Sequence, residues 1–348
     1  MRNESVTISK GIGIILMVIG HSKCPMLLDQ FIYMFHMPLF FIMSGFCFKE
    51  SYLSSSESRK LFIRRRIKGL YIPYVKWSLI FLLFHNVFLH LNIYNGTYRR
   101  KGDLSRNYVY THYLYNIPRI LGMLGNEQLL GGYWFLTTLF HSSILFLMSR
   151  IWLSNKHVLF IYSLLSIILY QFKNELPLGQ ILALDAIGVV FFSVGRIFVY
   201  YEKYLYKNRL QTAVVCLLIV FLGSLLFPSS LSGLRGWIVL PYVFVACCGT
   251  IMTYAISNYP PHSAHYVRRL LIFAGDNSIA ILTWHFLCFK IVSYIIILLY
   301  DLPIENLAQF PRISEYSEKG WWILYSFVGV CVPLGWQYLL KSLRADTI

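Results

Sequence analysis

The sequence predicts an all-α protein, a polytopic transmembrane helix bundle of about ten helices with both termini in the cytoplasm. Two observations predict this class. Only 13% of the 348 residues are charged, whereas soluble domains carry about 25%. Apolar stretches of roughly 18 or more residues recur along the chain, and each is long enough to cross a bilayer core.

The expected helices cover most of the chain, and their connections are short. Because short connections join neighbouring helices, we expect one integral-membrane domain over residues 1–348. Lys and Arg are more frequent on the side of the N-terminus, which predicts that this side is cytoplasmic. The connections 93–131 and 301–320 are longer and are expected outside. We expect membrane helices at residues 8–27, 31–48, 70–92, 132–152, 157–172, 180–200, 211–227, 236–257, 276–300 and 321–341.

The net charge of +16 could indicate a nucleic-acid partner. However, the basic residues lie between apolar stretches rather than along one soluble face. They are therefore interpreted as orientation signals next to membrane lipids, and no nucleic acid is expected.

The first helix carries two ionisable residues on one face. Lys10 and His21 are eleven residues apart, which returns them to within about 20° of each other with a rise of about 16 Å. Ionisable residues inside a bilayer are costly and indicate function. The alternatives are a helix-end lysine that reaches toward the interface and a histidine that faces the outer interface.

His36 lies in the apolar second helix, FIYMFHMPLFFIMSGFCF. Pro38 should loosen the helix near His36 and free a backbone carbonyl. His36 either serves catalysis or is a structural histidine bonded to a neighbouring helix. Ser44 and Gly45 permit close helix packing.

The segment RKLFIRRRIKGLYIPY holds six cationic residues between positions 59 and 68. It either sets orientation against anionic lipid or binds a phosphorylated cytoplasmic ligand, because Arg forks match phosphate oxygens. The candidate phosphate-binding residues are Arg64, Arg65, Arg66 and Lys68.

Further polar residues fall in or beside later helices. Trp134 opens the fourth helix, and Asn277 precedes the ninth, which carries His285. Each of these residues could form a structural hydrogen bond with another helix. Three histidines at membrane depth nevertheless favour a catalytic site, and they are His21, His36 and His285. Their spacings fit no metal motif, so no metal is expected.

Several motifs together resemble the membrane acyltransferase-3 superfamily and its fucose 4-O-acetylase-like branch. The spacing Lys10-x₁₀-His21 resembles the family's Arg/Lys-x₁₀-His signature. The runs KGIGIILMVIGH, FIYMFHMPLFFIMSGF, RRRIKGLYIPY, WFL and DNSIAILTWH follow in the family's order. One position departs from the pattern: many relatives carry a glutamate where this chain has Leu139.

The resemblance implies an integral enzyme of the bacterial inner (plasma) membrane. Acetyl-CoA or another acyl-CoA from the cytoplasm would be the co-substrate. The acceptor would be a hydroxyl of an envelope glycan or lipid-linked sugar.

The residues and the resemblance together suggest a mechanism. The donor's phosphates would bind the basic segment, and its arm would pass Lys10 to reach His21, the general base. Donors near His36, Asn277 and His285 would stabilise the oxyanion, and Trp134 would contact substrate. A transient acyl-histidine is an alternative course. A transporter or flippase for a glycan or lipid is the alternative function, because transport paths also carry intramembrane polar residues.

Overall fold

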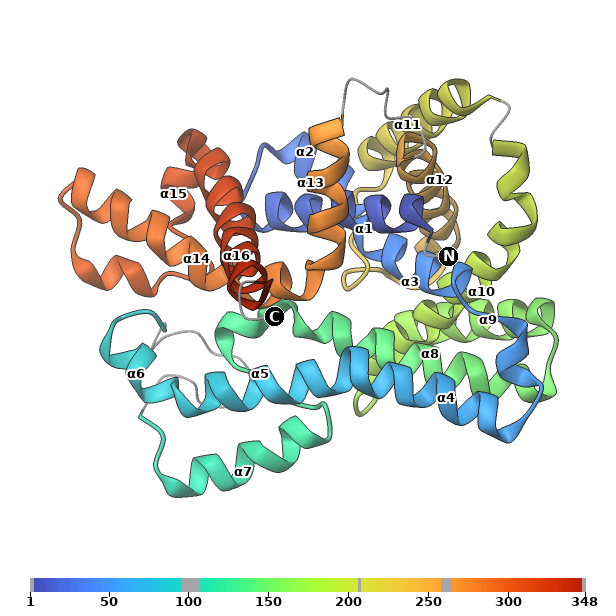
Figure 1. Ribbon diagram of the computed structural model, residues 1–348, viewed down its shortest axis with the longest axis horizontal. Coiled ribbons are helices and arrows are strands. Elements are labelled where there is room, and N and C mark those ends of the chain that lie inside the picture. The colour runs from blue at the N-terminus through green and yellow to red at the C-terminus, as the bar shows by residue number, and fades with distance from the viewer. Residues whose placement is uncertain (1–2, 95–106, 206–207, 258–264, 346–348) are drawn as a thin grey trace. The chain divides into compact units, whose positions relative to one another are not determined.

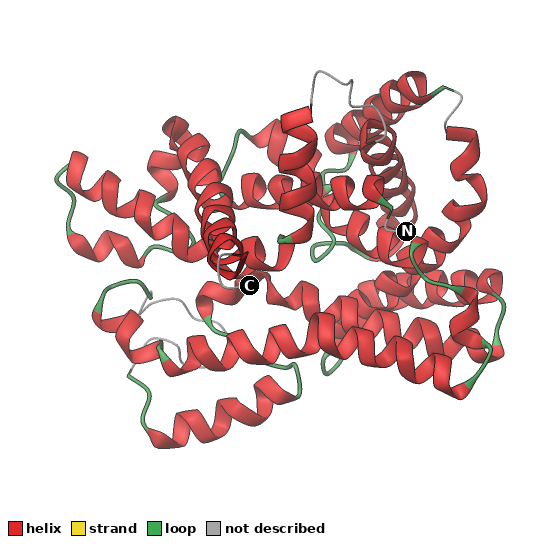
Figure 2. Cartoon of the chain, viewed as in Figure 1, coloured by secondary structure: helices red, strands yellow, loops and turns green. Residues whose placement is uncertain are grey.

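The structure is a computed structural model that describes residues 3–94, 107–205, 208–257 and 265–345. Every regular element within these ranges is helical (Figure 2), which confirms the all-α class. Eight segments of the described chain are long and apolar enough to cross a membrane, and each overlaps a predicted helix. They are Glu4–His21, Met26–Phe46, Gln128–Trp152, Gly179–Tyr204, Arg209–Leu226, Gly236–Ser257, Ser278–Leu299 and Ser314–Leu343.

The chain divides into two compact units, which are described separately. The first comprises Met1–Met17, Met26–Leu70 and Phe135–Asp276, and the second comprises Val18–Pro25, Tyr71–Trp134 and Asn277–Ile348. Helix α1, Glu4–His21, contributes residues to both units. A single domain over 1–348 stays a prediction.

The first unit is built around α10, which packs against α3 and α9, while α11 packs against α12 (Figure 1). Its elements beyond α1 are α2 (Met26–Tyr33), α3 (His36–Phe46), η1 (Glu50–Leu53), α4 (Ser56–Arg66), α8 (Trp134–Trp152), α9 (Asn155–Phe172), α10 (Gly179–Leu205), α11 (Arg209–Leu226), η4 (Gly236–Ile238), α12 (Val239–Ser257) and α13 (His265–Asp276).

Glycine allows the closest helix contact in this unit. A Cβ at Gly45 of α3 would lie 2.0 Å from the carbonyl oxygen of Phe192 in α10, and one at Gly195 would lie 2.1 Å from that of Ile42. Side chains larger than hydrogen therefore cannot fit at either crossing. The predicted packing role of Gly45 is confirmed.

The second unit has α14 (Ser278–Leu299) packed against α16 (Trp322–Ala345) (Figure 1). The 3-10 helix η3 (Gln128–Tyr133) also packs against α14. The other elements are α5 (Ile72–Leu83), α6 (His85–His90), α7 (Tyr110–Leu121), η6 (Ile304–Ala308), α15 (Ser314–Tyr316) and η7 (Ser317–Trp321). A π-helical turn, η2 (Ile67–Tyr71), precedes α5.

The second predicted helix is interrupted where the sequence suggested. Helix α2 ends at Tyr33 and α3 begins at His36, with Phe35 between them at φ −144° and ψ −20°. Pro38 lies in the first turn of α3, where its missing N–H is tolerated. The predicted loosening near His36 is confirmed.

The predicted helix 70–92 is interrupted at Phe84 and is not among the eight long apolar segments. Helix α5 ends at Leu83, and α6 begins at His85. His85 turns inward to Glu127, with 2.9 Å between its Nδ1 and the carboxylate oxygen, and Asn86 bonds the backbone of Tyr108. These pairings draw the chain away from a straight helix. The expected span 157–172 lies in α9, which begins with Asn155, Lys156 and His157 and is not among the eight apolar segments.

Candidate functional site

The basic segment lies in the first unit, at the end of α4. Arg65 donates a hydrogen bond to the hydroxyl of Tyr52, 2.6 Å away. Arg66 lies over two aromatic rings, 4.9 Å from the centroid of Phe62 and 5.5 Å from that of Phe192. Such contacts hold a guanidinium in a defined orientation. Arg64, Arg65 and Lys68 are exposed, and Arg66 is half-buried.

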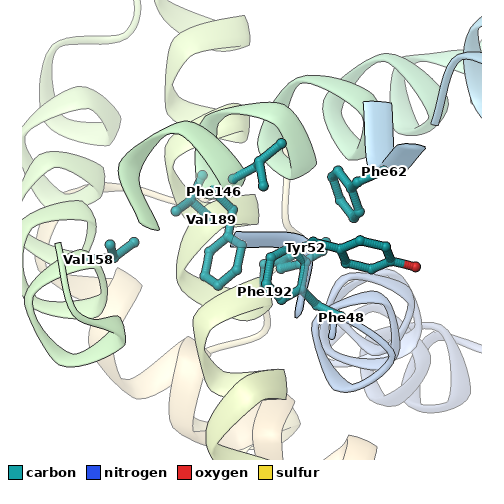
Figure 3. Close-up of a cluster of buried hydrophobic side chains, with 8 residues drawn as sticks. Phe48, Tyr52, Phe62, Phe146, Val158, Val189 and Phe192 are labelled. Atoms are coloured by element: carbon teal, nitrogen blue, oxygen red, sulfur yellow. The ribbon is translucent and has the colours of Figure 1, made fainter. Parts of the chain in front are cut away.

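The aromatic rings that Arg65 and Arg66 contact belong to a buried cluster (Figure 3). Phe48 contacts Tyr52, Phe62 and Phe192 with ring centroids 5.2 to 6.1 Å apart. Edge-to-face contacts of this kind stabilise a particular arrangement of rings. The cluster therefore fixes the platform on which Arg65 and Arg66 rest.

The loop after α3 is fastened by ion pairs. The carboxylate of Glu50 lies 2.8 Å from a guanidinium nitrogen of Arg150 and 3.1 Å from one of Arg196. Arg196 also donates to the carbonyl oxygen of Phe48, 2.5 Å away. Because Arg196 is only 7% exposed, this network ties the loop that carries Tyr52 to α8 and α10.

Lys10 and Arg66 both act electrostatically on the thiol of Cys47, which directly follows α3 in the first unit. Burial raises the pKa of Cys47, and the positive charges of Lys10 and Arg66 act in the opposite direction. Two of the predicted donor-binding cations thus influence the same cysteine.

His36 also belongs to the first unit and is 2% exposed. Its Nδ1 lies 2.8 Å from the carbonyl oxygen of Ile32. A carbonyl can only accept, so Nδ1 donates. The same carbonyl accepts from the backbone N–H of Phe35, 3.3 Å away, and the ring of Tyr33 packs edge-on against His36 with centroids 5.0 Å apart. This bonding within its own segment accounts for the burial of His36.

His21 and His285 lie together in the second unit. His21 is the last residue of α1, and its ring stacks on that of His285 with centroids 5.5 Å apart and planes 23° apart. The ring of Phe286 lies 5.0 Å from His21 and 4.0 Å from His285. His21 is half-buried, whereas His285 is fully buried behind it.

The hydrogen bonds of His285 define its tautomer. Its Nδ1 lies 3.0 Å from the carbonyl oxygens of both Ile281 and Leu282, so Nδ1 donates. In the neutral imidazole the other nitrogen, Nε2, then carries the lone pair. Nε2 is buried and has no hydrogen-bond partner among the described residues.

Helix η3 lies close to this histidine pair. A Cβ at Gly132 would lie 2.9 Å from a methyl of Leu282 and 4.0 Å from the ring of His285. The hydroxyls of Tyr133 and Thr283 lie 2.7 Å apart and join η3 to α14. Trp134 follows directly, half-buried, as the first residue of α8.

Asn277 precedes the first residue of α14 and is 9% exposed. It lies eight residues before His285, which corresponds to a rise of about 12 Å along the helix. Asn277 and His285 are therefore separate along α14 rather than parts of one cluster.

Sequence reasoning missed residues whose partners are distant in the chain. Tyr52 and Glu50 support the basic segment, and Phe286 borders both histidines. The buried pair of His85 and Glu127 was also missed, although a histidine inside a predicted apolar helix was a signal that could have found it. Nothing local distinguishes Tyr52 from the chain's other tyrosines.

A family model described as an acyltransferase domain, that of the acyltransferase-3 family, matches residues 3–340. The chain belongs to this family. A search of curated proteins and a search of solved structures each found no match. As a member of the acyltransferase-3 family, the chain is a multi-pass membrane acyltransferase.

The family's glutamate position is buried in this chain. Leu139 lies in α8 and is 6% exposed. Two residues later, His141 pairs with Asp185 of α10, with 3.0 Å between Nδ1 and the carboxylate oxygen. The first unit of this acyltransferase therefore has a buried carboxylate near that part of α8, contributed by another helix.

Proposed function

We propose that this acyltransferase moves an acyl group from cytoplasmic acyl-CoA, with acetyl-CoA as the expected donor, to a sugar hydroxyl of an envelope glycan or a lipid-linked sugar. The acyltransferase-3 match supports the enzyme class. One observation carries the finer proposal: α1 bears Lys10, which acts with Arg66 on Cys47, and ends at His21, which stacks on His285. We propose the bacterial inner membrane as the location.

The donor binds first through its phosphates. Arg64, Arg65, Arg66 and Lys68 supply the charge, and the guanidinium groups of Arg65 and Arg66 are already oriented by Tyr52 and Phe62. Oriented Arg forks bind phosphate oxygens at little further cost in side-chain entropy. The pantetheine arm then follows α1 past Lys10. The rise of about 16 Å between Lys10 and His21 is similar to the reach of that arm.

The transfer step needs one base. His21 accepts the proton of the sugar hydroxyl while the oxygen attacks the thioester carbonyl. The carbon–sulfur bond breaks, the carbon–oxygen ester bond forms, and His21 returns the proton to the departing CoA sulfur. The products are the sugar ester and free CoA. An acyl-histidine would divide the same exchange into two steps.

The remaining residues receive supporting roles. His285 supports the general base, because its buried ring stacks on that of His21. We assign Asn277 to an amide of the pantetheine arm, because it lies about 12 Å along α14 from His285. Trp134 contacts substrate beside η3. The roles of His36 and of the oxyanion donors stay predictions.

Substitution of His21 tests the proposal. In purified protein in nanodiscs, His21→Ala should abolish acyl transfer from acetyl-CoA to a glycan acceptor. It should leave the rise in unfolding midpoint caused by acyl-CoA unchanged, because a ligand that binds only the folded state stabilises it. His157→Ala, at an exposed histidine of α9, is the control and should retain turnover. Wild-type turnover by His21→Ala would refute the mechanism.

A further inference from the structure

Lys290 of α14 fastens the outer segment that follows the helix. It is 4% exposed and lies inside a predicted membrane span. Its ammonium donates to the carbonyl oxygens of Leu307 and Gln309, each 2.7 Å away. A lysine at such a depth is costly unless its charge is bonded. These two bonds therefore hold residues 307–309 against the middle of α14.

A second bond fastens the segment four residues later. The hydroxyl of Tyr325 in α16 accepts from the backbone N–H of Ile313, 3.2 Å away, and lies 2.8 Å from the hydroxyl of Ser293. All three residues are buried. The stretch between Gln309 and Ile313 is thus held at both ends by residues of α14 and α16.

Phe310 is the aromatic side chain of this stretch. Its ring lies 4.9 Å from that of Phe286, the residue that borders His21 and His285. Gly131 makes room for both rings, since a Cβ there would lie 3.4 Å from Phe286 and 3.5 Å from Phe310. Phe286 is buried, whereas Phe310 is half exposed. Phe310 therefore presents a ring to an incoming molecule beside His21.

We propose that Phe310, held in position by Lys290, is the wall of the acceptor subsite, against which the sugar ring stacks while one hydroxyl reaches His21. This inference rests on the proposed function. One face of a pyranose carries mainly C–H groups, and such a face packs well against an aromatic ring. The subsite thus recognises a hexose by one apolar face and by the hydroxyl that reaches His21.

Phe310→Ala provides the direct test. With the methyl glycosides of glucose, mannose, galactose and rhamnose as acceptors, it should raise the acceptor KM about tenfold, because one stacking contact is lost. The KM for acetyl-CoA and kcat should stay unchanged, and Phe310→Tyr should restore the acceptor KM. Tyr316→Ala is the matched control, because Tyr316 stacks on Tyr300 instead, 4.5 Å between centroids. Equal changes in the donor and acceptor KM, or none in the acceptor KM, would overturn the proposal.

Acceptor binding measured in the absence of acyl-CoA distinguishes a failure of this inference from a failure of the proposed function. Saturation-transfer NMR should detect the preferred methyl glycoside on the wild type and on Tyr316→Ala, with a signal about tenfold weaker on Phe310→Ala. If the wild type binds in this way but transfers no acyl group, the proposed donor or reaction fails while the subsite stands. Equal binding by wild type and Phe310→Ala rejects the subsite.

Lys290 has its own test as a positioning residue. Lys290→Met should raise the acceptor KM and leave the donor KM unchanged, because the loss of two bonds frees residues 307–309. Lys290→Arg keeps the charge and should recover most of the acceptor affinity. A loss of kcat with unchanged acceptor KM would remove the positioning role.

Discussion

Arg65 and Arg66 are neighbours with different environments, although the sequence presents them as one basic run. Arg66 rests on the rings of Phe62 and Phe192, and Arg65 donates to the Tyr52 hydroxyl. Arg65 is exposed, as Arg64 and Lys68 are, but its hydrogen bond to Tyr52 already orients it. Flexible cations lose more side-chain entropy when they bind a ligand. Among the four, Arg65 and Arg66 should contribute most to donor affinity.

Tyr52→Phe tests this difference in donor affinity by removing a single oxygen atom. The substitution removes the hydroxyl that accepts from Arg65 and leaves the aromatic cluster intact. A hydrogen bond to a charged group contributes about 1.5–3 kcal/mol when shielded, and partial exposure reduces this. We expect the KM for acyl-CoA to rise about three- to tenfold with kcat unchanged, measured by steady-state release of CoA.

Tyr162→Phe is the matched control for that prediction. The Tyr162 hydroxyl pairs with the neutral Ser149, 3.1 Å away, rather than with a cation. Its loss should leave the donor KM at the wild-type value. If both tyrosine variants changed the donor KM equally, orientation of Arg65 would not explain the effect.

At the scale of the element, the network of Glu50 joins the loop after α3 to two helices. Glu50→Gln should lower the free energy of unfolding by about 1–2 kcal/mol, because it leaves the largely buried Arg196 without its anionic partner. The figure is below that of a fully buried pair because the Glu50 side chain is 44% exposed. The midpoint of thermal unfolding in detergent checks this.

An exposed ion pair serves as the comparison. Glu315 and Lys319 form an i,i+4 pair with both side chains at least 60% exposed, and such pairs add little stability. Glu315→Gln should therefore leave the unfolding midpoint at the wild-type value. A shift as large as that of Glu50→Gln would show that any charge loss, and not the buried network, is responsible.

The elements also show which features local sequence can predict. The break before His36 was predictable, because Pro38 acts within its own turn. The expected helix 8–27 was too long at its end, because α1 ends at His21, where Lys23 has a φ of 60° and Pro25 follows. The break at Phe84 was not predictable, because it depends on the pairing of His85 with Glu127, 42 positions away. Long-range pairs of this kind have no local pattern.

The residues of the candidate site likewise divide into those that local sequence could predict and those that depend on distant partners. Lys10 and His21 were predictable from helical spacing, because one helix fixes both. The stacking of His21 on His285, the position of Phe310 beside Phe286 and the support of Arg65 by Tyr52 depend on segments far apart in the sequence. The sequence could name such residues only by their type. It could not assign their partners.

At the scale of the whole molecule, the charge asymmetry predicts that the basic segment faces the cytoplasm, and the proposed function requires it there. Chemical labelling of Cys47 tests both the orientation and the proposed function, because Cys47 is exposed and lies near Lys10 and Arg66. A membrane-impermeant maleimide should label Cys47 in inside-out vesicles but not in intact cells. Mass spectrometry of the Cys47 peptide measures this.

The same cysteine shows whether the donor binds at the basic segment. CoA should slow the alkylation of Cys47 in purified protein, because its phosphates and arm would cover the thiol. Arg65→Ala is the control, since loss of a donor-binding cation should weaken the protection of Cys47 by CoA. Dephospho-CoA should protect Cys47 less, because each lost phosphate removes charge-assisted bonds to arginine. Labelling of Cys47 from outside the cell would reverse the predicted orientation, whereas unchanged alkylation with saturating CoA would leave the segment only an orientation role.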